Sequence, residues 1–262
     1  MKKLLTLSIL LVAFILWMGC EKEVTLTAPD VDYTVTDNGG TLRLEWAEVA
    51  DADGYIIYAD DEVVDTVDVT SYDATIPAKV YGVQAYAGDN TSDITEIDCT
   101  PVVTQNIVVY GNSDPDPNHP SGLKFNTDGT ASAISLGTPP NPDVDFYFND
   151  YNPYQGSIEL TSPDEHSPVY NDEENAGKDA GTTNFDDADN ADAPGSGYLT
   201  KVPLNNGAVY YLWIDPNANG WDTQDHYGKM KVVNISGTSA PYTVTINVAY
   251  QKIPGLRWCV TP

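Results

Sequence analysis

Short runs rich in Val, Ile, Tyr and Thr dominate the chain after residue 20, and Gly, Pro, Asn and Asp separate them. Several of these runs alternate apolar and polar residues, the spacing that turns one face of a β-strand toward a core. None carries the apolar spacing of an amphipathic helix. With 18 Pro and 20 Gly among 262 residues, the sequence predicts an all-β protein made of two β-sandwich domains in tandem. The clearest runs are residues 42–46, 55–59, 79–86, 145–148, 209–214, 229–235 and 242–250.

The first 20 residues are unlike the rest of the chain. A positively charged start and an apolar stretch over residues 4–18 lead to Gly19-Cys20. The stretch is shorter than the roughly 20 apolar residues that span a membrane. It resembles the signal peptide and lipobox of bacterial lipoproteins, although the two residues before Gly19 depart from the usual pattern. The resemblance implies that residues 1–19 are a signal peptide and that Cys20 is acylated.

This resemblance also implies a location. Residues 20–23 form the lipidated tether, and the acidic segment after Cys20 is similar to the surface-export signals of Bacteroidetes lipoproteins. Each buried methylene of an acyl chain contributes about 0.8 kcal/mol, so stable attachment needs more than one chain. We therefore expect a protein of the bacterial cell envelope, held by its lipid anchor at the outer membrane and exposed on the cell surface.

The chain is strongly acidic, with 39 Asp and Glu against 12 Lys and Arg and a formal net charge of −27. Nucleic-acid binding needs clustered basic residues that displace counterions from phosphates, so this composition excludes nucleic acid as a partner. The acidity has two interpretations: cation binding, or the solubility of a surface protein.

Two cysteines remain if Cys20 is acylated. Cys99 ends the first predicted domain and Cys259 lies near the C-terminus. Outside the reducing cytosol an even pair of thiols is a candidate disulfide, and this one joins the end of the chain to the junction between the domains.

Residues 24–101 resemble a fibronectin type III domain. The likeness rests on residues 42–46, which end in Trp46, on residues 52–58, and on residues 81–86, in which Tyr81 takes the tyrosine-corner position of that family. The connection over residues 60–71 is short, so we expect a rudimentary strand there. The resemblance implies a spacer or an interaction module.

Residues 103–262 form the second predicted β-sandwich, which contains an acidic insert over residues 162–197 that we expect to be a surface excursion. The C-terminal third resembles the haem-scavenging lipoproteins of the HmuY type. That likeness rests on residues 209–213, 226–232 and 247–250, with an earlier echo at 144–148. It implies an all-β sandwich. Haem ligation needs two opposed imidazoles, and the chain offers His119, His166 and His226. Neither His119 nor His166 matches a ligand of that family, so the sequence disfavours haem without excluding it.

Calcium is the other candidate cofactor. Residues 215–222 place oxygen-bearing side chains at alternate positions before a Gly, a spacing that wraps a chain around a hard cation. A hairpin loop with Asn-Gly turn chemistry explains the same residues without a cation. The candidate ligands are Asp215, Asn217, Asn219, Asp222 and Asp225.

Catalytic motifs are missing from the sequence: we find no nucleophile elbow, no zinc-binding HExxH and no phosphate-binding glycine loop. The aromatic clusters at residues 146–148, Tyr151, Tyr154 and residues 210–213 suit either a sandwich core or stacking on sugar rings or a partner peptide. We therefore expect no enzyme but a binding or adhesion module, displayed on a spacer, whose partner is a protein, a glycan or a small ligand. The alternatives are a haem- or metal-capture lipoprotein of the HmuY-like type and a glycan-binding accessory protein of an uptake system.

Overall fold

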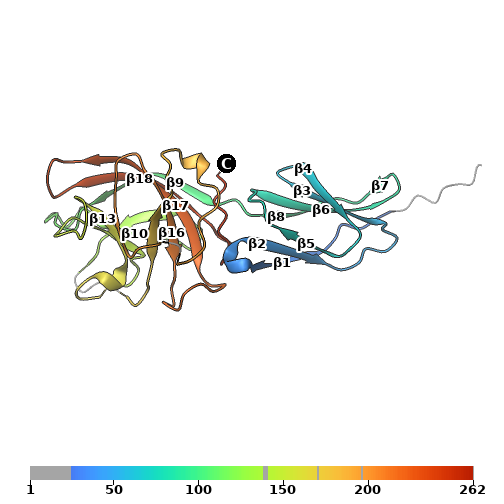
Figure 1. Ribbon diagram of the computed structural model, residues 1–262, viewed down its shortest axis with the longest axis horizontal. Coiled ribbons are helices and arrows are strands. Elements are labelled where there is room, and N and C mark those ends of the chain that lie inside the picture. Colours follow the sequence, from blue (N-terminus) through green and yellow to red (C-terminus); the bar gives the residue numbers. More distant parts are fainter. Residues whose placement is uncertain (1–24, 138–140, 170, 196, 262) are drawn as a thin grey trace, which may run out of the picture.

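The computed structural model describes residues 25–137, 141–169, 171–195 and 197–261. It is all-β, as predicted: within these ranges the strands form four antiparallel sheets, and the helical elements are three short 3-10 turns. Two sandwiches lie end to end along the long axis of the molecule (Figure 1). No helix in the described part of the chain is long and apolar enough to cross a membrane. The predicted signal peptide, Cys20 and the tether lie outside the described residues. The 3-10 turns are η1 (Asp37–Gly39), η2 (Pro163–Glu165) and η3 (Phe185–Asp187).

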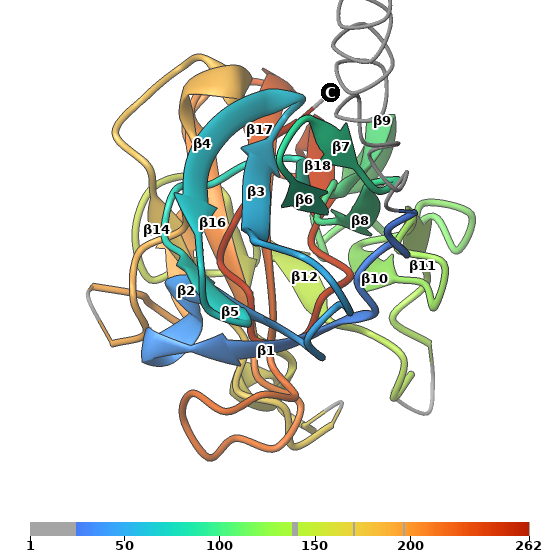
Figure 2. The same cartoon turned by 90° about the vertical axis from the view of Figure 1, so that its right-hand side faces the viewer.

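The first domain is a sandwich of two sheets. One has the order β1-β2-β5 and the other the order β4-β3-β6-β7, with β8 also paired to β6. Seen along the long axis, the two sheets lie one above the other in front of the second domain (Figure 2). The expected rudimentary strand over residues 60–71 is instead the six-residue strand β4. The strands are β1 (Val31–Thr36), β2 (Thr41–Trp46), β3 (Gly54–Ala59), β4 (Glu62–Val67), β5 (Ser71–Ala74), β6 (Val80–Ala87), β7 (Asn90–Thr91) and β8 (Thr95–Asp98).

The alternation of the sequence determines which residues form this domain's core. Leu42, Leu44 and Trp46 of β2 are buried, whereas Arg43 points outward and pairs with Asp73 of β5 at 3.0 Å. The hydroxyl of Tyr81, near the start of β6, donates a hydrogen bond to the carbonyl of residue 76 at 2.7 Å. That bond back to the preceding chain is the geometry of a tyrosine corner.

The second domain is a larger sandwich. One sheet has the order β14-β16-β17-β18-β9 and the other the order β11-β10-β12-β13-β15. Their facing sides enclose a single core that includes Phe146, Leu160, Tyr210 and Met230. The strands are β9 (Val102–Tyr110), β10 (Gly122–Phe125), β11 (Ala131–Ile134), β12 (Phe146–Asn149), β13 (Glu159–Thr161), β14 (Ala176–Asp179), β15 (Lys201–Pro203), β16 (Val209–Ile214), β17 (His226–Ser236) and β18 (Thr243–Tyr250).

The acidic insert over residues 162–197 is more ordered than its composition suggests. It supplies β14, which pairs with β16 at the edge of the sheet, and its Asn175 and Ala188 are fully buried. The side-chain amide of Asn175 donates to the carbonyl of Asp145 at 2.7 Å, and its oxygen accepts from the backbone N–H of Asp215 at 2.8 Å. The interpretation of this segment as a surface excursion is therefore wrong for these parts.

The C-terminal segment after β18 crosses back to the first domain. Ile253, Leu256 and Trp258 belong to the hydrophobic core of that domain, where the ring of Trp258 lies 5.6 Å from the ring of Tyr81. The predicted domain of residues 103–262 therefore ends in a segment that completes the core of its neighbour. The last described residues lie at the junction between the two sandwiches (Figure 1).

Close backbone contacts fix this segment in place. The backbone N–H of Arg257 donates to the carbonyl of Gly39 at 3.0 Å. The buried side-chain amide of Gln251 donates to the backbone carbonyl of Cys99 at 2.8 Å. Gly39 has a φ of +85°, and a Cβ there would collide with the carbonyl of Gly255. A glycine is required at this position both for its backbone conformation and for the close approach of the two domains.

The predicted disulfide is absent, because Cys99 and Cys259 are both free and buried. Cys99 lies in the core of the first domain, whereas Cys259 packs with Ala191 and Tyr227 in a separate cluster of the second. Successive residues of an extended chain point in opposite directions. Because Trp258 points into the first domain, Cys259 points away from it and from Cys99.

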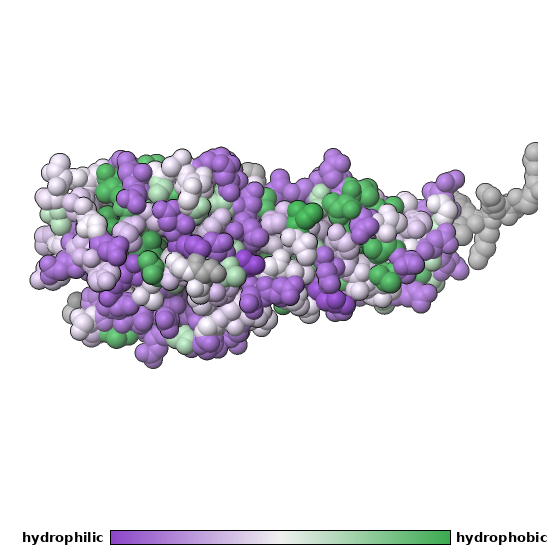
Figure 3. Space-filling model, viewed as in Figure 1, coloured by the Kyte–Doolittle hydropathy of each residue, from purple (hydrophilic) through white to green (hydrophobic). Residues whose placement is uncertain are grey.

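The surface of the molecule is mainly hydrophilic, with apolar side chains gathered over β3 and β4 of the first domain (Figure 3). Val63 and Val64 of β4 are among the exposed aliphatic residues. β4 is the edge strand of its sheet, and its charged residues Glu62 and Asp65 interrupt the apolar surface.

Mild acid is expected to raise the free energy of unfolding of the wild type, and to raise that of Asp145→Asn less. Burial raises the pKa of Asp145 to about 7 from an ordinary 3.8, and the nearby Glu173 raises it further. The stability that such a carboxyl contributes is fully present below the pKa that it has in the unfolded chain. This stability is lost as the pH rises through the pKa that the carboxyl has in the folded protein. Going from about pH 8 to about pH 5 should therefore raise the free energy of unfolding by about 2 kcal/mol more in the wild type than in Asp145→Asn. Denaturant unfolding at both pH values measures this, and equal pH dependence in the two proteins contradicts it.

Candidate functional site

A polar pocket lies on the outer face of the sheet β11-β10-β12-β13-β15. Phe146 and Phe148 of β12 point into the core, so Tyr147 between them points to the opposite face, and Glu159 likewise precedes the core residue Leu160 in β13. The pocket has a volume of about 380 Å³, within the range usual for small-ligand sites. Its lining residues are Asn112, Tyr147, Asn149, Tyr151, Asn152, Tyr154, Glu159, Glu165, His166, Ser167 and Lys201. We call it the tyrosine pocket.

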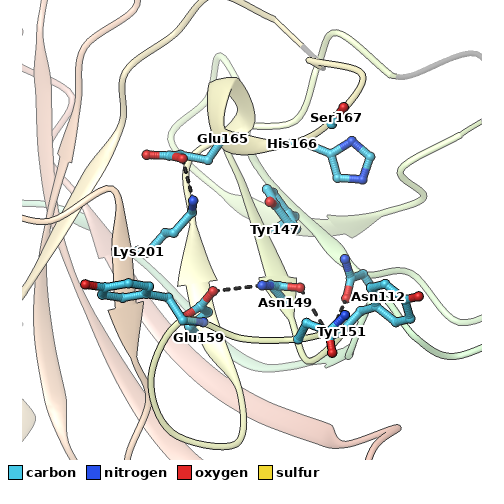
Figure 4. Close-up of a pocket in the computed structure, with 11 residues that line it drawn as sticks. Asn112, Tyr147, Asn149, Tyr151, Glu159, Glu165, His166, Ser167 and Lys201 are labelled. Atoms are coloured by element: carbon cyan, nitrogen blue, oxygen red, sulfur yellow. Dashed lines mark hydrogen bonds and ion pairs between the residues drawn. The ribbon is translucent and has the colours of Figure 1, made fainter.

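Glu159 organises the floor of the tyrosine pocket. Its side chain is almost completely buried. One carboxylate oxygen accepts a hydrogen bond from the Asn149 amide at 2.7 Å (Figure 4). The other accepts from the backbone N–H groups of Tyr154 at 3.0 Å and Gln155 at 3.3 Å. The buried carboxylate therefore joins β12 to the loop that carries Tyr154.

Two tyrosines of that loop present their rings to solvent. Tyr151 is 68% exposed and Tyr154 is 77% exposed, which is unusual for side chains of this size. The backbone N–H of Tyr151 donates to Asn112 Oδ1 at 3.3 Å and to Asn149 Oδ1 at 3.2 Å. Backbone hydrogen bonds thus hold both residues at the pocket while their rings remain accessible.

An ion pair closes one side of the pocket. Lys201 Nζ lies 2.5 Å from Glu165 Oε2, and the Thr200 hydroxyl donates to Glu165 Oε1 at 2.6 Å. Hydrogen bonds from Lys201 and Thr200 lower the pKa of Glu165, so this carboxylate is ionised at neutral pH. Figure 4 shows Glu165 and Lys201 facing each other, away from Asn112 and Tyr151 and with Tyr147 between.

The chemistry of these side chains suits a ligand with apolar faces and many hydroxyl groups. An exposed aromatic ring attracts C–H groups to its electron-rich face, and amide or carboxylate groups exchange hydrogen bonds with hydroxyls. A sugar ring offers both surfaces at once. The ion pair of Glu165 and Lys201 adds a hydrogen-bond acceptor and a hydrogen-bond donor without adding a net charge.

The three histidines lie in separate environments. His166 lines the tyrosine pocket, where its Nδ1 donates to the carbonyl of Pro168 at 2.7 Å and its ring meets that of Tyr147 edge-on at 5.4 Å. His119 contacts Asp114 at 2.9 Å and stacks on Tyr110. His226 stacks on Tyr250, and burial lowers its pKa. Each imidazole is engaged with a different element.

The predicted calcium loop folds onto its own first residue. Asp215 is buried, and its carboxylate accepts hydrogen bonds from the backbone N–H groups of Asn217, Asn219 and Gly220 at 3.1, 3.4 and 2.9 Å. The amide of Asn219 donates to Asp222 at 3.1 Å. These are the bonds of a self-capped turn.

Asp225, the last of the candidate ligands, is buried beneath the same loop. Its Oδ2 accepts from the indole N–H of Trp213 at 2.8 Å, and burial raises its pKa to about 6. Within the described ranges no group of three or more His, Cys, Asp or Glu side chains converges as a metal site does. Calcium binding here stays a prediction of the sequence.

No protein-family model matches the chain, and no curated protein matches it.

Sequence reasoning found the tyrosines of the pocket but not its polar residues. Glu159, Glu165 and Lys201 come from a three-residue strand, a 3-10 turn and a second three-residue strand. Elements of this length leave almost no periodic signal. The density of Tyr and Asn between residues 147 and 154 is the one local signal that points to this surface.

Proposed function

We propose that the protein is a lipid-anchored binding module of the bacterial cell envelope that captures a glycan in the tyrosine pocket. The observation that carries this proposal is the pair of strongly exposed rings of Tyr151 and Tyr154, held by backbone hydrogen bonds beside a cluster of amide and charged groups. Exposed aromatic rings at the rim of a polar pocket are a preorganised stacking surface. The anchor rests on the sequence around Cys20.

The proposed activity is binding without catalysis. Hydrolysis of a glycosidic bond uses two carboxyl groups that are available to the substrate, one of them protonated. In the tyrosine pocket Glu159 is buried and accepts three hydrogen bonds from protein groups, and Glu165 is paired with Lys201. Both carboxylates therefore have structural partners, which favours recognition of the glycan over its cleavage.

The first domain serves this site as a spacer. A fibronectin type III-like assignment is supported by the strand order β1-β2-β5 against β4-β3-β6 and by the bond from the Tyr81 hydroxyl back to the preceding chain. The C-terminal segment packs into the core of this domain. The two sandwiches are thereby coupled, which suits a stalk that holds the tyrosine pocket away from the membrane.

Loss of both exposed tyrosines is expected to weaken glycan retention strongly. We expect the chain from Glu21 onward, which keeps every described residue, to be retarded in gels containing at least one of cellulose derivatives, starch, xylan or mannan. The Tyr151→Ala/Tyr154→Ala double variant should bind about thirtyfold more weakly, because each ring contributes roughly 1 kcal/mol of stacking and about 1.4 kcal/mol is tenfold in affinity. Affinity electrophoresis measures both proteins.

Tyr33→Ala is the matched control for this experiment. Tyr33 is 43% exposed and lies in β1 of the first domain, far along the chain from the pocket. The control should bind as the wild type does. Retention that survives in the double variant excludes the tyrosine pocket as the site, and a wild-type protein that no polysaccharide retards refutes glycan binding itself.

A further inference from the structure

A second pocket adjoins the tyrosine pocket and shares two residues with it. This flanking pocket has a volume of about 440 Å³ and is lined by Tyr154, Gln155, Leu199, Thr200 and Lys201. Tyr154 and Lys201 line both pockets. The two hollows therefore lie on either side of one exposed tyrosine.

Tyr154 has the features of a ridge between two subsites. Its backbone N–H donates a hydrogen bond to the buried Glu159, while the residue as a whole is 77% exposed. On one side lie the amide groups of the tyrosine pocket. On the other side Leu199, a 51% exposed aliphatic residue, offers an apolar surface beside the Thr200 hydroxyl. A chain of sugar rings presents alternating apolar faces and hydroxyl edges to such a surface.

The backbone beneath the flanking pocket is fixed. Leu199 exchanges both of its backbone hydrogen bonds with Gly177 of β14, each at 2.9 Å. The Leu199 side chain can therefore be changed without removing the bonds that hold its segment to the sheet. Thr200 in turn donates to Glu165, which belongs to the tyrosine pocket.

The charges along the two pockets disfavour an anionic ligand. Their formally charged side chains are Glu159 and Glu165 against Lys201, with His166 nearby. Lys201 is already neutralised by Glu165 at 2.5 Å. The surrounding protein carries a formal charge of −27, which repels a polyanion from any surface that lacks a basic cluster.

We infer that the two pockets form one groove with at least two subsites, which binds a neutral polysaccharide chain across Tyr154. The inference rests on the proposed function and adds to it the length and the charge class of the ligand. The tyrosine pocket holds one part of the chain, Tyr154 stacks on a ring at the middle, and the Leu199 surface receives the continuation.

Affinity should therefore increase with the length of the oligosaccharide. The test is calorimetric titration of the chain from Glu21 onward with cello-, malto-, xylo- and manno-oligosaccharides of one to six units. In the series that binds, we expect at least a tenfold gain between the shortest ligand and the four-unit ligand, because longer chains bury the second subsite.

Leu199→Ala is the variant that separates the two subsites. It should reduce the affinity for four-unit and longer ligands about tenfold while leaving that for the shortest binding ligand unchanged. Val233→Ala, which removes a 40% exposed aliphatic side chain from β17, should match the wild type at every length. Polygalacturonate serves as the anionic competitor and should not displace the bound neutral ligand.

The outcomes distinguish this inference from the proposal on which it rests. Binding that is independent of length, or that Leu199→Ala leaves unchanged, overturns the groove while the tyrosine pocket remains a glycan site. Preferential binding of polygalacturonate overturns the neutral class. If no series binds and no polysaccharide retards the protein, the proposed function fails and the groove fails with it.

Discussion

Trp258→Ala is expected to lower the free energy of unfolding by about 3 to 5 kcal/mol and to destabilise the first domain more than the second. Trp258 is fully buried, but its partners belong mainly to the other end of the chain: it lies in the hydrophobic core of the first domain, against Tyr81. Alanine at this position leaves a cavity where the indole stood. Since a sandwich of this size has a small core, the loss is a large fraction of its stability.

Two further variants separate packing from other effects of this substitution. The indole N–H of Trp258 is buried without a hydrogen-bond partner, so Trp258→Phe should cost much less than Trp258→Ala. Lys252→Ala changes an exposed side chain of the same segment and should alter stability by less than about 0.5 kcal/mol. Denaturant unfolding followed by tryptophan fluorescence gives the midpoints. A Trp258→Ala midpoint equal to that of Lys252→Ala contradicts a structural role for the indole.

The same tryptophan shows why the domain organisation was only partly predictable. The resemblance of residues 24–101 to a fibronectin type III domain implies a boundary near residue 101, and in the structure this residue lies in the short connection between β8 and β9. The return of residues 253–258 to the first domain could not be predicted from the sequence. A few apolar residues spaced along a Gly- and Pro-containing segment do not indicate which hydrophobic core they join. Only the three-dimensional arrangement shows that Ile253 and Leu256 join Leu42 and Tyr81.

The sequence predicted the strands better than it predicted which side chains contact one another. The runs that predict β16, β17 and β18 contain alternating core residues such as Tyr210, Leu212 and Met230, and each became a strand. A period of two is a local property, so the sequence displays it directly. The pairing of Glu159 with Asn149, and of Glu165 with Lys201, depends on strand order within a sheet, which no local pattern specifies.

The loop at Asp215 shows that oxygen-bearing side chains at alternate positions do not by themselves establish a cation site. Oxygen-bearing residues at alternate positions predict cation ligands, and the same spacing allows a carboxylate to accept the amides of its own turn. The structure uses Asp215 in the second way, with three backbone N–H donors between 2.9 and 3.4 Å. The bond from the Asp215 backbone N–H to Asn175 also ties this loop to the acidic insert.

Asp215→Ala is therefore expected to lower the free energy of unfolding by about 2 to 3 kcal/mol in the presence of a chelator, because the substitution leaves the loop amides without their acceptor. Asn217→Ala removes an exposed side chain of the same loop and is the matched control, with an expected loss below about 0.5 kcal/mol. Thermal and denaturant unfolding in EDTA measure both variants. The size of the loss follows from burial: Asp215 is 2% exposed, so water replaces its carboxylate poorly as an acceptor.

Repeating the measurement in calcium separates turn capping from cation binding. A cation that binds only the folded loop raises the melting temperature of the wild type by mass action, and the Asp215→Ala variant should lack that increment. Capping instead predicts that the variant is already destabilised in EDTA, where no cation is present. Equal stability of the wild type and Asp215→Ala in EDTA, together with stabilisation of the wild type alone by calcium, contradicts the capping role and assigns the Asp215 carboxylate to the cation.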